Sequence, residues 1–373
     1  MKKYDIIVIG AGNSGLSAAV RSAISGKKTL LIEQHNVPGG CATSFVRGRF
    51  EFDPSLHEMC DYGTKENPGE VKSLMDDMGV DFDRLPVKDL FRVISKFSDG
   101  TPMDVTMPCG KDAFFDAMEK YVPGSRPYMD TLWALILECR EGIEYLSNGE
   151  TEYKASVLIK KYMNMLKAGT YSVNQVFEAL NIPQKCRDIF SAYWSYLGVN
   201  MDQIAFTHYS LMVEKYINKG ASIPRHTSHQ LSTRLLERFR QAGGECLFTC
   251  RAEEILFDGE KACGVRTTKG NFYGDYILSN INPEITLGKR VPKDKVPDFE
   301  KRLVSARNGN FCGRMFTVYL GLDCSYEDLG ITDYSIFFMN SADSVKEYNS
   351  IKDKEKNEFN IFLCYNVSNP DVS

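Results

Sequence analysis

Two glycine clusters near the N-terminus restrict the fold of this chain more than any other feature of its sequence. The first cluster, GAGNSG at residues 10–15, follows an apolar run at residues 4–9 and overlaps a stretch of small and apolar residues at 14–25 that has helical spacing. A second apolar run, TLLIE at residues 29–33, comes next. A strand, a helix and a strand within about thirty residues form a βαβ unit, which predicts a parallel sheet.

Each glycine of the first cluster has a physical role in such a unit. Gly10 allows a tight turn, Gly12 lets a diphosphate approach the main chain, and Gly15 lets the helix pack closely on the strand. The first N–H groups of the helix are free to bind phosphate oxygens. Glu33, at the end of the second strand, can accept hydrogen bonds from ribose hydroxyls. The pattern predicts a dinucleotide-binding loop.

The second cluster distinguishes between the two common dinucleotides. Pro38, Gly39 and Gly40 follow Glu33 directly, and a Gly-Gly pair lets the main chain run against the diphosphate and the ribityl part of a longer cofactor. An ordinary Pro-Gly-Gly turn is the alternative interpretation. We interpret the pair as favouring FAD over NAD.

With GAGNSG, LIEQHNVPGGCATSF and FEFDPSLHEM in view, the chain resembles the FAD-dependent family of phytoene desaturases, carotenoid isomerases and retinol saturases. Within that family it looks most like the all-trans-retinol 13,14-reductase branch. The resemblance extends to residues 220–270, similar to the second FAD segment of the family, where Ala252 would contact the adenine through its backbone. The residues predicted to bind FAD are Gly10, Gly12, Asn13, Ser14, Gly15, Glu33, Gln34, Gly39, Gly40, Cys41 and Ala252.

The resemblance also implies the chemistry. The reaction would transfer a hydride between flavin N5 and a carbon of a conjugated double bond in a hydrophobic substrate, with a proton transferred at the neighbouring carbon. His57 is the candidate for proton transfer or flavin contact, and a hydrogen-bonded structural histidine is the alternative. Ser55 stands where the family commonly has glycine. The family's last glycine-rich segment has no counterpart here, so we expect the N-terminal portion of a longer enzyme.

The fold class we predict is α/β, with a Rossmann-like FAD-binding domain interleaved with a substrate domain of helices and an antiparallel sheet. LFRVISKF and MDVTMP flank a Ser-Asp-Gly-Thr turn and predict a β-hairpin. Three more strands are expected at MFTVYLGLD, YSIFFM and FNIFLCYNVS. The predicted boundaries place residues 1–64 and 220–300 in the FAD-binding domain, and residues 65–219 and 301–373 in the substrate domain.

Composition excludes some partners. The net charge is -4 and no basic run exists, so nucleic acid is not expected. Eleven cysteines without a C-x-x-C pair suit a reducing compartment, and we expect a cytoplasmic protein with no metal site. Residues 157–169 mix apolar residues with lysines and could contact a membrane peripherally, although a solvated helix packed on its neighbours is the commoner outcome.

Three questions stay open at this point. A second G-x-G-x-x-G is absent, so the electron donor or acceptor is unknown and could be a quinone, a carrier protein or a nicotinamide bound in another way. An amine-oxidase-like flavoprotein would share both FAD segments. A non-enzymatic binding protein of the GDP-dissociation-inhibitor type would keep the fold without the cofactor, and the intact glycines with Glu33 argue against it.

Overall fold

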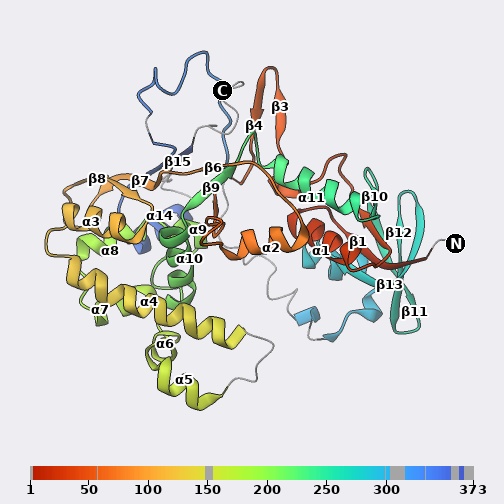
Figure 1. Ribbon diagram of the computed structural model, residues 1–373, viewed down its shortest axis with the longest axis horizontal. Helices are drawn as coiled ribbons and strands as arrows, with labels where there is room; N and C mark the ends of the chain where they lie inside the picture. The colour runs from red at the N-terminus through yellow and green to blue at the C-terminus, as the bar shows by residue number, and fades with distance from the viewer. Residues whose placement is uncertain are drawn as a thin grey trace.

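The computed structural model of the protein describes residues 3–56, 58–147, 154–298, 300–302, 316–331, 333–353 and 361–364. A six-stranded sheet occupies one end of the molecule (Figure 1). Its strand order is β10-β2-β1-β13-β12-β11. The strands are β1 (Lys3–Ile9), β2 (Thr29–Ile32), β10 (Glu245–Leu247), β11 (Ala252–Asp258), β12 (Lys261–Thr267) and β13 (Gly270–Ser279).

This sheet has a parallel half and an antiparallel half. Strands β10, β2, β1 and β13 pair in parallel, whereas β11, β12 and β13 form an antiparallel meander. All four residues of β2 are buried, as expected for a central parallel strand whose two faces are both covered. The predicted Rossmann-like α/β fold with a parallel sheet is therefore confirmed.

Helices α1 (Asn13–Ile24) and α11 (His229–Gln241) pack together against one face of this sheet. Val8 and Leu31 point from the sheet into the same apolar cluster as Leu16 and Leu235. Helix α2 (Glu70–Met78) adds Met75 and Met78 to that cluster. Residues of α2 thus pack with the nucleotide-binding sheet, beyond the boundary predicted at residue 64. The opposite face of the sheet holds a second cluster, formed by Ile7, Ile9, Leu30, Ile32, Ala252, Ile255 and Val265 among others.

The other end of the molecule contains a four-stranded sheet of order β15-β14-β7-β8. The predicted hairpin is confirmed as an antiparallel pair of strands. Strand β14 pairs in parallel with β7 and antiparallel with β15, so the sheet is mixed where we expected an antiparallel one. The strands are β7 (Asp89–Lys96), β8 (Pro102–Pro108), β14 (Ser335–Phe338) and β15 (Ile361–Cys364).

The strand predicted at MFTVYLGLD is wrong over its described part. Residues 316–322 form no strand, and Phe316, Val318 and Leu320 are exposed. Alternation of apolar residues predicts a strand only if a neighbouring strand pairs with it and a core covers one face. Neither condition is met among the residues that the structure describes.

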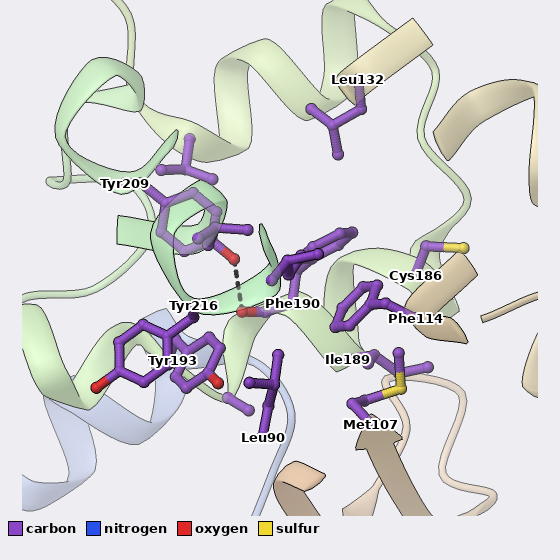
Figure 2. Close-up of a cluster of buried hydrophobic side chains, with 14 of the residues drawn as sticks. Leu90, Met107, Phe114, Leu132, Cys186, Ile189, Phe190, Tyr193, Tyr209 and Tyr216 are labelled. Atoms are coloured by element: carbon purple, nitrogen blue, oxygen red, sulfur yellow. Dashed lines mark hydrogen bonds between the residues drawn. The ribbon is translucent and has the colours of Figure 1, made fainter. Parts of the chain in front are cut away.

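Helices surround the four-stranded sheet, and their apolar faces form the largest core. Figure 2 shows part of it, where the Tyr209 hydroxyl donates a hydrogen bond of 2.8 Å to the Phe190 carbonyl oxygen. The helices are α3 (Lys111–Tyr121), α4 (Arg126–Ser147), α5 (Ala155–Lys161), α6 (Met163–Ala168), α7 (Val173–Ala179), α8 (Gln184–Ser191), α9 (Trp194–Leu197), α10 (Phe206–Lys219) and α14 (Ser344–Lys352).

Short elements join the two ends of the molecule. One of them is a three-stranded sheet of order β5-β9-β6, whose central strand β9 lies between α10 and α11 in the sequence. A separate hairpin, β3 with β4, projects beside it (Figure 1). The bounds are β3 (Phe45–Arg47), β4 (Phe50–Phe52), β5 (Met59–Cys60), β6 (Arg84–Pro86) and β9 (Ala221–Pro224), with short helical turns η1 (Gly40–Ala42), α12 (Pro283–Ile285), η2 (Thr286–Arg290) and η3 (Lys293–Lys295). Within the described ranges, every helix is too short or too polar to span a bilayer.

Candidate dinucleotide site

The first glycine cluster forms the turn from β1 into α1. Gly10 adopts a φ of 98°, a backbone conformation that side chains disfavour, and its N–H donates to the Ile32 carbonyl at 2.8 Å. The first bond of the helix runs from the Leu16 N–H to the Gly12 carbonyl at 2.9 Å. The N–H groups of Asn13, Ser14 and Gly15 precede that bond, so helix geometry leaves them available to an anion.

Gly15 and Gly12 lack side chains for different reasons. A Cβ on Gly15 would lie 2.1 Å from the Gly10 carbonyl oxygen, so glycine is required for the helix to pack on its own entry turn. A Cβ on Gly12 would meet only the Asn280 Nδ2 atom, at 3.3 Å. That is a tight contact with one side chain, and no backbone atom lies within 4 Å of the Cβ position, so only glycine leaves the main chain here free to lie against a diphosphate.

The second glycine cluster packs directly on the first. The Gly39 N–H donates to the Ala11 carbonyl at 2.8 Å, and Gly39 forms an isolated parallel bridge with Gly12. Gly39 and Gly40 have φ values of 115° and 61°, and a Cβ on Gly40 would lie 3.2 Å from the Gly12 Cα. Two stretches that the sequence suggested separately thus form one cradle. Cys41 follows in the exposed turn η1.

Glu33 directs its carboxylate at this cradle. The side chain is buried, with one oxygen accepting from the Ala11 N–H and the other from the His35 N–H, each at 2.7 Å. A carboxylate oxygen has two acceptor positions, so each can still accept from a ribose hydroxyl. Gln34, the next residue, is exposed.

The segment with Ala252 lies next to Glu33. The Cys250 N–H donates to the Glu33 carbonyl at 2.8 Å, and the Thr249 N–H donates to the His35 carbonyl at 2.9 Å. Ala252 is buried at the start of β11. The structure therefore brings together all eleven residues predicted to bind FAD around one edge of the sheet, and their binding role stays a prediction.

Two residues at this edge were missed by the sequence analysis. Asn280 is the first residue after β13, and its amide lies against the backbone of Gly12 and Gly15. Ser232 of α11 is fully buried and donates to the Asn13 Oδ1 atom at 2.7 Å. Asn280 could have been predicted from its position, because it directly follows a strand of the parallel sheet and ligands of open α/β sheets bind where parallel strands end. No local pattern marks Ser232.

The chain after the hairpin is tied to the cradle and to α11. Ser55 is the residue that stands where the resembling family commonly has glycine. Its hydroxyl donates to the Cys41 carbonyl at 2.6 Å. Asp53 accepts from both the N–H and the hydroxyl of Ser228, at 2.9 and 2.6 Å. Burial raises the pKa of Asp53, and the bonds from Ser228 oppose that rise. His57 lies outside the described residues.

Glu58 is the most unusual titratable group near this segment, and the sequence analysis did not select it. The side chain is 7% exposed, and burial raises its pKa to about 8. A buried carboxyl with so high a pKa is a frequent mark of a functional site. Within the described ranges, no group of three or more histidine, cysteine, aspartate or glutamate residues is arranged to hold a metal ion.

Comparison with known proteins shows which families have similar sequences. A family model for an NAD(P)-binding Rossmann-like domain matches residues 8–77. All-trans-retinol 13,14-reductase from Homo sapiens is 26% identical over 363 residues, covering 93% of this chain and 58% of the reductase. The chloroplastic prolycopene isomerase of Daucus carota is 23% identical over 318 residues, covering 82% of this chain and 51% of the isomerase. The predicted resemblance to retinol saturases and carotenoid isomerases is confirmed.

The solved structure of putrescine oxidase bound to putrescine has a TM-score of 0.54 to this chain at 14% identity, covering 82% of this chain and 63% of the oxidase. This similarity shows a shared fold. The chain is thus a homologue of enzymes that act on polyenes, has a Rossmann-like dinucleotide-binding fold, and spans little more than half the length of the curated relatives named above.

Proposed function

We propose that this protein is an FAD-dependent oxidoreductase that acts on a carbon-carbon double bond of a polyene or related lipid. The observation that carries the proposal is the joined cradle, in which Gly39 and Gly40 pack on Gly12 in front of the Glu33 carboxylate. Homology to retinol 13,14-reductases and prolycopene isomerases supports the substrate class. The electron donor or acceptor could be a quinone, a carrier protein or a nicotinamide.

The residues of the site fit FAD. The diphosphate would lie over Gly12 and accept from the N–H groups of the first turn of α1, and Glu33 would hold the adenosine ribose. Ala252 would contact the adenine through its backbone. Gly40 and Cys41 leave main chain open beyond the diphosphate, where a ribityl chain continues and NAD has none. When bound, FAD would supply hydride exchange at its N5 atom.

The experiment is flavin retention by a glycine variant. Gly12→Val should fill the space over which the diphosphate passes, so the purified protein reconstituted with FAD should lose the flavin absorbance. Gly288→Val is the matched control, because a side chain on Gly288 would meet open space and the residue is not among those predicted to bind FAD. Equal flavin content in both variants would refute the proposed cofactor site.

Substrate assays separate the alternatives. Turnover of an amine such as putrescine by the flavin-loaded protein, without turnover of a polyene alcohol, would favour the amine-oxidase-like interpretation. Unmodified protein that stays colourless after reconstitution would favour a binding protein of the GDP-dissociation-inhibitor type. Saturation, desaturation or isomerisation of the polyene would support the main proposal.

We also propose that this protein is cytoplasmic and contacts an anionic membrane surface through α5 and α6. The ten described cysteines are all free thiols, as a reducing compartment requires. Figure 1 shows α5 and α6 at the lower edge, away from both sheets. Residues 154–177 contain four lysines and no acidic residue, although the whole chain has a net charge of -4.

Apolar side chains are exposed beside those lysines. Ile159 on α5 and Met163 and Leu166 on α6 are 57%, 37% and 39% exposed. On the neighbouring helix α4, Glu141 and Glu144 pair with Arg140, whereas the Glu138 carboxylate accepts from the Asn164 N–H at the start of α6. Exposed apolar side chains beside several lysines are typical of a surface that lies on an anionic membrane.

Vesicle co-sedimentation tests this contact. The protein should sediment with phosphatidylcholine vesicles that contain phosphatidylserine, and sediment less with pure phosphatidylcholine. Ile159→Asp with Leu166→Asp should abolish sedimentation, whereas Leu74→Asp, at a 45% exposed leucine of α2, should leave it unchanged. Equal sedimentation of all three proteins would refute the assignment of this surface.

A further inference from the structure

Glu58 lies where the nucleotide-binding part of the chain meets the substrate part. Ser55, bound to the Cys41 carbonyl, precedes it by three residues, so the Cα of Glu58 lies within about 10 Å of a residue tied to the cradle. Its two carboxylate oxygens are both buried and have no hydrogen-bond partner within the part of the chain that the structure describes. A buried carboxylate without partners is costly, and the cost is avoided when the group holds a proton.

The surroundings of Glu58 come from the substrate part of the chain. The rings of Tyr193 and Tyr216 lie side by side, with centroids 5.1 Å apart (Figure 2), and Tyr196 stacks on Tyr193 at 5.4 Å. The hydroxyls of Tyr193 and of Ser335 on β14 are buried and lack partners among the described residues. The site is therefore an aromatic wall with several buried polar atoms whose hydrogen-bonding capacity is unused among the described residues.

No cation balances Glu58 among the described residues. Burial is the largest cause of its raised pKa, and it is opposed by the nearby Ser335 hydroxyl, which does not reach hydrogen-bond geometry with the carboxyl. Lys215 lies in the same region but is bound to Asp61 and Glu70. The titratable groups that sense the charge of Glu58 all have raised pKa values and are neutral at pH 7: Cys60 on β5, Cys109 after β8, Tyr193, Tyr196 on α9, Tyr216 on α10 and Cys364 on β15.

We propose that Glu58 is a protonated acid at neutral pH and donates its proton to a carbon of the substrate's double bond. As the π bond breaks, one carbon takes a hydride from the reduced flavin and the other takes the proton of the Glu58 carboxyl. Two C–H bonds form, and Glu58 is left as a carboxylate. This inference rests on the proposed function for its substrate, whereas the protonation state of Glu58 does not.

A groove gives a route for the proton to return. Its volume is about 950 Å³, and its lining includes Cys109, Ala221 and Ser222. Ser222 pairs with Met59, the residue after Glu58, and Cys109 senses the charge of Glu58. The groove is therefore bordered by residues that adjoin Glu58 in the fold. Protons would return to Glu58 from this side between turnovers, while the buried carboxyl itself stays out of contact with bulk water.

Infrared spectroscopy tests the protonation state without any turnover. The C=O stretch of a protonated carboxyl should be present at pH 7, disappear in Glu58→Gln, and fade in the unmodified protein as the pH rises past about 8. Glu214→Gln is the control, because Glu214 is also buried but is paired with Arg140 at 3.1 Å, and it should leave the band in place. Identical spectra for the unmodified protein and Glu58→Gln at pH 7 would overturn the proposal.

Turnover then tests the role. With FAD bound and reduced, Glu58→Gln should retain its flavin and saturate an all-trans polyene alcohol at least about 100-fold more slowly. Glu58→Asp should recover part of the rate, with a changed pH profile. Unchanged turnover in Glu58→Gln would overturn the proposal and leave the proposed function intact. A flavin-loaded unmodified protein that reduces no polyene would instead overturn the proposed function, and with it the substrate assigned to this acid.

Discussion

Replacing Glu58 by glutamine should change how the stability of the protein depends on pH. The folded state holds the Glu58 proton up to a pH of about 8, whereas the ordinary pKa of a glutamate, 4.5, applies in the unfolded chain. Between pH 4.5 and about 8, Glu58 holds a proton in the folded state but not in the unfolded chain. The free energy of unfolding therefore falls as the pH rises through this range. At about 1.36 kcal/mol for each pH unit, the loss is about 3 kcal/mol from pH 4.5 to 7 and about 4 kcal/mol by pH 9.

Glutamine removes this dependence because it does not titrate. We expect urea unfolding to show Glu58→Gln and the unmodified protein close in stability at pH 5, with the variant gaining about 4 kcal/mol on the unmodified protein by pH 9. The difference between the two curves isolates one group, because every other titrating residue is common to both. Glu214→Gln, which breaks a pair with Arg140, is the control for the loss of a buried carboxylate that has a partner. Parallel curves for Glu58→Gln and the unmodified protein would refute a neutral Glu58.

Three further perturbations test the cradle and the junction. Gly15→Ala should push α1 away from the Gly10 carbonyl, lowering the free energy of unfolding by about 1–3 kcal/mol and weakening FAD binding, as measured by urea unfolding and flavin fluorescence. Glu33→Gln should retain the fold while raising the Kd for FAD about tenfold in a fluorescence titration, because charge-assisted bonds are the stronger ones. Lys215→Met leaves the buried Asp61 carboxylate, 8% exposed, without its ion pair and should cost about 3 kcal/mol. Lys72→Met should cost less than about 1 kcal/mol, because its partner Asp76 is 57% exposed. Equal losses would contradict the importance of carboxylate burial.

The turn at the first glycine cluster could be predicted because its causes are local. Gly10, Gly12 and Gly15 act within one turn of chain, and the apolar run of β2 is fully buried as a central parallel strand requires. The contact between the two glycine clusters was harder to predict from the sequence. The Gly12–Gly39 bridge joins two residues whose spacing indicated a common ligand but not a direct contact. The strand predicted over residues 316–322 was wrong because its alternating apolar residues were the only basis for it. Without a pairing strand those side chains stay exposed.

Glu58 could not have been selected from the sequence, for a physical reason. An isolated glutamate in SLHEMC has the signature of a surface residue, because charged side chains are seldom buried without a partner. Its environment is instead made by Tyr193 and Ser335, which are far from it in sequence and reach it only after the two parts of the chain have folded together. Burial then changes the chemistry of the group, since a carboxyl that is an anion in water becomes a neutral acid among aromatic rings. A residue whose function depends on such an assembled environment has no pattern of its own, so its unpaired oxygens in the structure are the first place where it can be recognised.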